Sequence, residues 1–122
     1  SEVDLGVAVP AGTQVLLGAR TSRQFALRVA MQGHLFGAEE ALAAGYADQL
    51  SDDPLATATE LATKLAQKPG RGPAVTKGLY NSDLSRTVRE ADAAGLEAFL
   101  DSWFSDEAQQ SIQALAAKLS GK

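Results

Sequence analysis

The sequence predicts a mainly α-helical fold, and three observations support this prediction. Apolar residues recur at intervals of three and four positions over most of the chain, which is the period of an amphipathic helix. Capping residues precede several of these stretches, and glycine or proline follows them. The alternation typical of a strand is confined to the first ten residues and to a short segment at positions 46–50.

The N-terminal part is expected to be extended or loop-like over residues 1–12 and then helical. Apolar and small or acidic residues alternate over residues 1–12 until a Pro-Ala-Gly sequence interrupts the pattern. A short helix is predicted over 13–18. A second helix is predicted after a cap at Thr21 or Ser22, and Gly33 is expected to end it.

The central stretch predicts a two-turn helix followed by a short strand. Glu39 and Glu40 lie in the first turn after Gly37, where their charge complements the positive end of the helix dipole. Gly45 is expected to end this helix in the left-handed conformation. Residues 46–50 are then predicted to form a short strand or extended segment.

The next segment begins with a strong helix start signal. Asp53 is followed by proline at the first helical position, and leucines and alanines at helical spacing predict that one face of this helix is buried. A Pro-Gly pair closes it. A short helix is then predicted over 74–80, with a break at 81–83.

The last third predicts a long amphipathic helix and a final shorter one. The long helix begins at Leu84, and Gly95 within it indicates a second backbone packed closely against that position, because glycine costs about 1 kcal/mol relative to alanine in a helix. Ser105 is expected to cap the final helix.

Composition and charge exclude several classes of protein. The chain has 122 residues, no cysteine and one histidine, so it fits a single domain without disulfides, a thiolate metal site, a zinc cluster or a Ser-His-Asp triad. The lone His34 is expected to be a solvated turn residue. The net charge of −4 argues against a nucleic-acid partner, and no apolar run is long enough for a membrane span. Because the first residue is Ser1 rather than Met, we expect the chain to start inside a longer protein.

Four motifs occur in an order and spacing that resemble one enzyme family. They are an opening Glu-Val-Asp-Leu-Gly followed by Pro-Ala-Gly-Thr-Gln, a helix ending at Gly33, an A-x-E-A-x-x-x-G-L-V-D-like signature at 38–48, and a closing segment at 105–118. Together they resemble the C-terminal half of the crotonase, or enoyl-CoA hydratase/isomerase, superfamily.

The resemblance implies a place for this chain in a larger fold. It implies the helical C-terminal (trimerisation) region of an α/β crotonase (ClpP/crotonase-like) spiral fold, with residues 1–20 as the end of the core and active-site segment and 21–122 as the helical region. The implied partners are the chain's own N-terminal half and further copies in a homotrimer or dimer of trimers. The family's oxyanion hole lies in that N-terminal half, so the isolated chain is expected to be inactive.

The resemblance makes Glu2 the candidate catalytic residue. At this position of the motif the family has a glutamate that acts as general base or acid beside the C2 to C4 carbons of an acyl-CoA. A carboxylate partly removed from water is suited to take the weakly acidic proton next to a thioester carbonyl. The alternative interpretation is an exposed glutamate without a function.

The resemblance also implies candidates for substrate binding and narrows the reaction. Lys77 and Lys118 are candidates for coenzyme A phosphates, with solvated helix-end charges as the alternative. Phe36 is a candidate for the acyl pocket, with a core contact as the alternative. Pro10 stands where dienoyl-CoA isomerases carry an aspartate, which disfavours that reaction and places Pro10 among the substrate-binding candidates.

Two reactions and one other class of function stay open. The reactions are hydration of 2-enoyl-CoA and isomerisation of 3-enoyl- to 2-enoyl-CoA, with coenzyme A as part of the substrate and no separate cofactor. The alternative function is a non-catalytic helical oligomerisation or interaction module derived from a crotonase. A helix-turn-helix regulator over 22–50 conflicts with the acidic balance. A cytoplasmic location is expected, and the mitochondrial or peroxisomal matrix is also compatible with the resemblance.

Overall fold

A computed structural model of the chain describes residues 1–121, and all regular secondary structure in this range is helical. The prediction of a mainly α fold is therefore confirmed. The elements are a 3₁₀ turn η1 (Val3–Leu5) and the α-helices α1 (Ala11–Arg20), α2 (Arg23–Gln32), α3 (Ala38–Ala43), α4 (Pro54–Ala66), α5 (Gly72–Trp103) and α6 (Asp106–Ser120).

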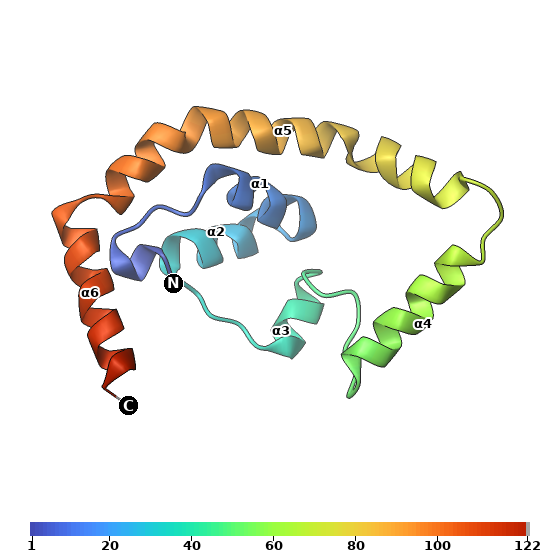
Figure 1. Ribbon diagram of the computed structural model, residues 1–122, viewed down its shortest axis with the longest axis horizontal. Helices are drawn as coiled ribbons and strands as arrows, with labels where there is room; N and C mark the ends of the chain where they lie inside the picture. Colours follow the sequence, from blue (N-terminus) through green and yellow to red (C-terminus); the bar gives the residue numbers. More distant parts are fainter. Residues whose placement is uncertain (122) are drawn as a thin grey trace.

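The helices form an arch around a small packed centre (Figure 1). The long helix α5 spans the top, α4 descends from its first residues, and α6 descends from its end. Helices α1 and α2 lie beneath α5, and α3 lies between them and α4. The most extensive contact is between α1 and α5, and η1 contacts both α2 and α6. The N-terminal segment is therefore held inside the arch.

The predicted start signals of α2, α4 and α6 and the predicted glycine stops after α2 and α3 are confirmed. Ser22, Asp53 and Ser105 each accept a hydrogen bond from the backbone N–H three residues later, at 3.1, 3.0 and 3.2 Å. Gly33 and Gly45 have positive φ values of 64° and 78° and follow α2 and α3 as expected. Local side-chain capping thus sets the start of α2, α4 and α6, and a left-handed glycine follows α2 and α3.

The predicted close packing at Gly95 is also confirmed. A Cβ atom added at Gly95 would lie 2.9 Å from the Cβ of Ala11 in α1. Only glycine at this point of α5 lets the two helices approach so closely.

Helix α1 begins earlier than the sequence predicts because its cap comes from α5. The backbone N–H of Gly12 donates to Asp92 Oδ1 at 2.6 Å, and the N–H of Ala8 donates to Ser102 Oγ at 3.0 Å. A Cβ on Gly12 would collide with the Asp92 carboxylate. The helix therefore starts at Ala11 instead of Thr13, because a carboxylate 80 residues away in the sequence accepts a hydrogen bond from its first turn.

The segment over residues 1–12, predicted to be extended or loop-like, is not extended at its start, where a 3₁₀ turn forms over Val3–Leu5. The carbonyl oxygen of Glu2 accepts hydrogen bonds from the N–H groups of Leu5 and Val7, both at 3.0 Å, and Gly6 turns the chain with φ 78°. These bonds close a 3₁₀ turn, because no neighbouring strand within residues 1–121 offers a ladder. Only the segment after Gly6 runs without regular structure to α1.

Of the short strand or extended segment predicted over 46–50, the strand does not form. The N–H groups of Tyr46 and Ala47 both donate to the carbonyl of Ala41, at 2.9 and 3.1 Å. The chain therefore folds back on the end of α3, bends over 46–48 and has no regular structure at 49–50.

The predicted break at 81–83 is also wrong, since α5 runs through it without interruption. The polar residues bond within the helix: Ser82 Oγ donates to the carbonyl of Leu79, and Thr87 Oγ1 donates to that of Asp83. Asp83 also pairs with Arg86 at 3.2 Å, one turn later. Polar side chains without a proline or glycine do not end a helix that can satisfy them internally.

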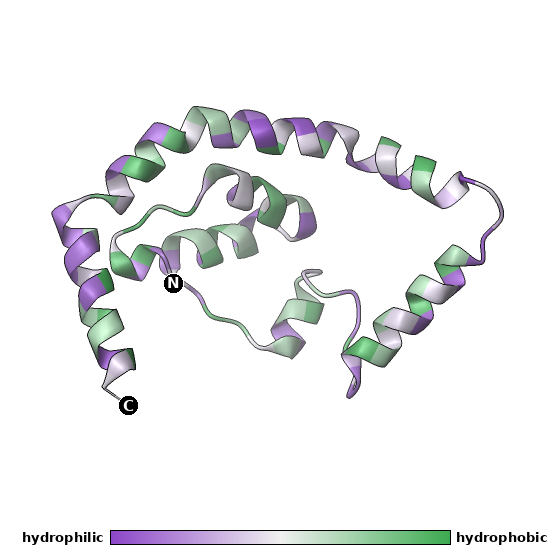
Figure 2. Cartoon of the chain, in the orientation of Figure 1, coloured by the Kyte–Doolittle hydropathy of each residue, from purple (hydrophilic) through white to green (hydrophobic). Residues whose placement is uncertain are grey.

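The prediction that one face of α4 is buried is wrong within this chain, as α4 and α5 contain no buried residue. Apolar residues recur along α4, α5 and α6 (Figure 2), and many large ones are exposed. The chain exposes 9177 Å² of accessible surface. A compact protein of 12.7 kDa is expected to expose about 6,200 Å², so the arch leaves roughly 3,000 Å² more than a self-contained domain.

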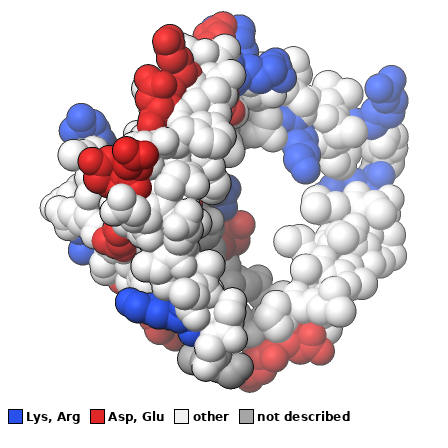
Figure 3. All heavy atoms as spheres, turned by 60° about the vertical axis from the view of Figure 1, so that its left-hand side comes forward, with Lys and Arg blue, Asp and Glu red and all other residues white. Residues whose placement is uncertain are grey.

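Charge is distributed unevenly over the arch (Figure 3). Residues 90–107, in the second half of α5 and the start of α6, contain six acidic side chains and no basic one, whereas residues 61–82 contain four basic side chains and no acidic one. None of the helices described is both long enough and apolar enough to cross a lipid bilayer.

Candidate functional site

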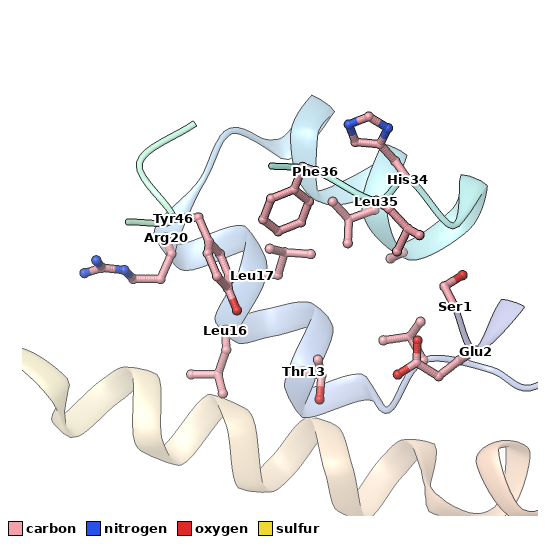
Figure 4. A pocket seen from close by; sticks show the side chains of 13 residues that line it. Ser1, Glu2, Thr13, Leu16, Leu17, Arg20, His34, Leu35, Phe36 and Tyr46 are labelled. Atoms are coloured by element: carbon pink, nitrogen blue, oxygen red, sulfur yellow. The ribbon is translucent and has the colours of Figure 1, made fainter. Parts of the chain in front are cut away.

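A hollow of about 780 Å³ lies beside the N-terminal turn, beneath α1 and α2 (Figure 4). This volume falls within the range of small-molecule sites, about 300–1,000 Å³. Its walls are mainly apolar, and its polar residues lie at the edges. The lining residues are Ser1, Glu2, Val9, Thr13, Leu16, Leu17, Arg20, Val29, Ala30, His34, Leu35, Phe36 and Tyr46.

Glu2 lies at one end of this hollow. The 3₁₀ turn fixes its backbone through the bonds from Leu5 and Val7. Its side chain is exposed, and its carboxylate has no hydrogen-bond partner among residues 1–121. Glu2 also borders a second, smaller hollow between the turn and Leu115 of α6. A carboxylate at this place is free to interact with a ligand.

An aromatic cluster forms the far wall of the hollow. The ring of Phe36 packs edge-on against Phe25 and Tyr46, with centroid separations of 5.1 and 5.3 Å. Phe25 is a buried core residue of α2. The core therefore holds Phe36 at the hollow, although Phe36 belongs to the loop between α2 and α3.

A charged cluster behind this wall holds the same loop. Glu40 of α3 accepts a hydrogen bond from Arg28 Nη2 at 2.8 Å, and His34 Nε2 lies 2.8 and 2.9 Å from its two carboxylate oxygens. The hydrogen bond to His34, followed by charge and hydrogen-bond contributions that include Arg28, lowers the pKa of Glu40 below the usual 4.5. The cluster links α2, the loop and α3.

The prediction that His34 is a solvated turn residue is therefore wrong. Its side chain is 31% exposed, and its Nε2 is within hydrogen-bond distance of Glu40. No local spacing rule predicts the association of His34, Arg28 and Glu40, because Arg28 and Glu40 are 12 residues apart on different helices.

Tyr46 lies at the end of the hollow opposite to Glu2, and Arg20 lies beside it with its guanidinium pointing away from the hollow (Figure 4). Arg20 Nη2 donates to both oxygens of Asp48 at 3.1 and 3.2 Å. The Tyr46 hydroxyl makes no hydrogen bond among the residues the structure describes. Sequence reasoning did not single out either residue, because each becomes part of the site only when α1 and the turn after α3 meet.

The remaining predicted site residues are dispersed. Pro10 is the residue before α1, between the hollow-lining Val9 and Thr13, but does not itself line the hollow. Lys77 lies in α5, in a separate hollow near the α4 corner. Lys118 lies exposed in the last turn of α6 and lines neither hollow. The structure thus places Glu2 and Phe36 at one hollow, whereas the binding roles of Pro10, Lys77 and Lys118 stay predictions.

This arrangement of helices is similar to part of two solved enoyl-CoA hydratase/isomerase structures. An enoyl-CoA hydratase/isomerase from Mycobacterium paratuberculosis superposes with a TM-score of 0.85 and 25% sequence identity, over 93% of this chain and 45% of that one. A putative enoyl-CoA hydratase/isomerase from Acinetobacter baumannii superposes with a TM-score of 0.79 and 28% identity, over 89% of this chain and 46% of that one.

The chain thus spans less than half the length of these two structures. No family model matches the sequence, and no curated protein matches it. The similarity is carried by the three-dimensional arrangement and confirms the crotonase resemblance: the chain has the fold of the C-terminal portion of a crotonase-superfamily enoyl-CoA hydratase/isomerase.

Proposed function

We propose that this chain is the C-terminal portion of an enzyme that moves a proton on a fatty acyl-CoA thioester, with Glu2 as the general base and acid. The observation that carries the proposal is the unpartnered Glu2 carboxylate at the mouth of an apolar hollow of ligand size. The similarity to enoyl-CoA hydratase/isomerase structures supports the substrate class.

The chemistry follows from the position of the carboxylate. A carboxylate beside a thioester takes a proton from the carbon next to the carbonyl or from the conjugated position, and the negative charge moves onto the carbonyl oxygen. Returning the proton to the other carbon shifts the double bond, which is isomerisation. Hydration instead adds water across a 2-enoyl bond and needs a second acid or base outside this chain.

The carbonyl oxygen needs hydrogen-bond donors as it gains charge, and such donors are commonly worth several kcal/mol. The resemblance places them in an N-terminal half. We therefore propose that the chain alone is inactive, and that it works in a longer protein that assembles as a homotrimer or a dimer of trimers. The large exposed apolar surface of α4, α5 and α6 supports an assembly of this kind.

The test is Glu2→Gln in the full-length protein that includes this chain, assayed with 2-enoyl and 3-enoyl thioesters. Loss of the general base is expected to lower turnover about 10²- to 10⁴-fold. The matched control is Glu97→Gln, because Glu97 is an exposed glutamate in α5 far from the hollow in sequence. Unchanged turnover in Glu2→Gln would exclude the proton-transfer role.

The second candidate is a non-catalytic interaction module, which would also account for the excess of exposed surface. A standard interface buries about 800 Å² per partner, so the roughly 3,000 Å² of excess surface is enough to dock a partner without any chemistry. If the full-length protein assembles but turns over neither thioester, this candidate replaces the enzyme.

A further inference from the structure

The turn that follows Glu2 lies between two helices from distant parts of the sequence (Figure 1). The 3₁₀ turn η1 contacts α2 on one side and α6 on the other. A Cβ atom on Gly33, the residue after α2, would lie 2.7 Å from Oδ2 of Asp4, so the α2 side of the turn is closely packed. The position of Glu2 at the hollow therefore depends on what α6 presents to the other side of the turn.

Ala108, in the first turn of α6, is the residue that the turn covers completely. Its exposed fraction is 0%. A Cβ atom on Gly6 would lie 3.7 Å from the N and Cα atoms of Ala108 and 3.8 Å from its Cβ, which is van der Waals contact. Because no accessible space surrounds the Ala108 methyl group, a larger side chain there would displace the turn.

Ser102, in the last turn of α5, holds the chain immediately after the turn. Its Oγ accepts a hydrogen bond from the N–H of Ala8 at 3.0 Å and donates one to the carbonyl of Phe99 at 2.8 Å, so the hydroxyl is itself fixed by the helix. Val7, the residue before Ala8, is only 2% exposed. The corner between α5 and α6 thus fixes residues 6–8 by packing and by one hydrogen bond.

Backbone hydrogen bonds connect residues 6–8 with Glu2. The N–H of Val7 donates to the carbonyl oxygen of Glu2 at 3.0 Å, and the N–H of Leu5 donates to the same oxygen. The Glu2 carboxylate has no hydrogen-bond partner among residues 1–121, so its place is set through the backbone. A displacement of Val7 would therefore move Glu2 relative to the hollow.

We propose that Ala108 and Ser102 are positioning residues for Glu2, and that together they set the distance from its carboxylate to a thioester in the hollow. The inference rests on the proposed function and adds the residues that fix its geometry. Proton transfer requires the carboxylate to lie within hydrogen-bond reach of the carbon-bound proton, and a misplacement of about 1 Å can lower turnover about 10²-fold. The small side chain of Ala108 and the hydroxyl of Ser102 thus control the rate without touching the substrate.

The test uses the full-length protein that includes this chain, assayed with 2-enoyl and 3-enoyl thioesters. Ala108→Leu is expected to lower kcat on the order of 10- to 100-fold and to leave KM close to that of the parent, since the walls of the hollow are unchanged. Ala108→Gly leaves the turn its room and is expected to keep most of the turnover. Ala117→Leu is the matched control, because Ala117 is exposed and lies nine residues later, on the opposite face of α6.

A double-mutant cycle with Glu2→Gln separates positioning from a general loss of structure. If Ala108 acts through Glu2, Ala108→Leu lowers turnover in the parent and leaves the residual turnover of Glu2→Gln unchanged. Ser102→Ala removes the acceptor for the Ala8 N–H without adding volume, and it is expected to lower kcat several-fold in the parent alone. It provides the same cycle if circular dichroism shows that Ala108→Leu does not fold.

The outcomes separate the inference from the proposed function. Equal losses of turnover in the parent and in Glu2→Gln overturn the positioning role, and so does full turnover in every variant at positions 102 and 108 that folds. Either result leaves the proposed role of Glu2 intact. Unchanged turnover in Glu2→Gln itself overturns the proposed function, and the inference with it.

Discussion

Replacing the glycine at the crossing of α1 and α5 should destabilise the protein, whereas the same change elsewhere in α5 should stabilise it. Gly95→Ala would place a methyl group 2.9 Å from the Cβ of Ala11, while Gly78→Ala would place one where no heavy atom lies within 4 Å. Both glycines lie inside the same helix, so both substitutions gain the same helix propensity, about 1 kcal/mol.

The packing contribution separates the two changes. Carbon atoms pack best at about 3.5–4.0 Å, so Gly95→Ala requires α1 and α5 to separate by roughly 0.6–1 Å. The Ala11 methyl group cannot rotate away, because its position is set by the backbone of α1. Overpacking of this kind costs about 1–3 kcal/mol. The net expectation is a loss of about 0–2 kcal/mol for Gly95→Ala and a gain of about 1 kcal/mol for Gly78→Ala.

Urea unfolding followed by far-UV circular dichroism measures both free energies of unfolding. The double variant Ala11→Gly with Gly95→Ala removes the close contact and should be more stable than the sum of its single changes predicts, by about 1 kcal/mol or more. The reasoning is refuted if Gly95→Ala stabilises the chain as much as Gly78→Ala does, since the close approach would then not exist.

Two further predictions concern the carboxylates that hold the site. Asp92→Ala removes the acceptor for the Gly12 N–H and should lower the free energy of unfolding by about 1 kcal/mol, whereas Asp92→Asn keeps an acceptor and should lose less; urea unfolding distinguishes them. The hydrogen bond to His34 lowers the pKa of Glu40, so its contribution to stability is present above the usual 4.5 and is lost as the pH falls below that value. Unfolding midpoints measured from about pH 6 to 3 should therefore fall less steeply in Glu40→Gln than in the parent, and equal slopes would contradict the assignment.

The order of the sequence motifs predicted one part of the candidate site and gave no indication of the other part. Glu2 belongs to the opening motif, and Phe36 precedes the signature at 38–48. Both residues line one hollow. Of the two residues at the other end of that hollow, Arg20 lies outside the four motifs, and Tyr46 lies within the signature at 38–48 but was not predicted to be a site residue. Their proximity depends on the turn at 45–47, where two N–H groups bond to one carbonyl and direct the chain back toward α1.

The sequence by itself determined where most helices begin and end, because a cap is a contact between neighbours in the chain. Ser22, Asp53 and Ser105 bond to backbone groups three residues away, and no distant part of the molecule is needed to place them. The glycine at position 95 likewise indicated close packing, since its cost in a helix calls for a compensating contact.

Only the tertiary structure decided which elements meet and where a local preference is overruled. The Asp92 carboxylate starts α1 from 80 residues away, and residues 46–50 form no strand because the described part of the chain offers them no neighbouring strand. Capping energies act over one helical turn, whereas strand pairing and packing between helices depend on segments that folding brings together from far apart in the chain.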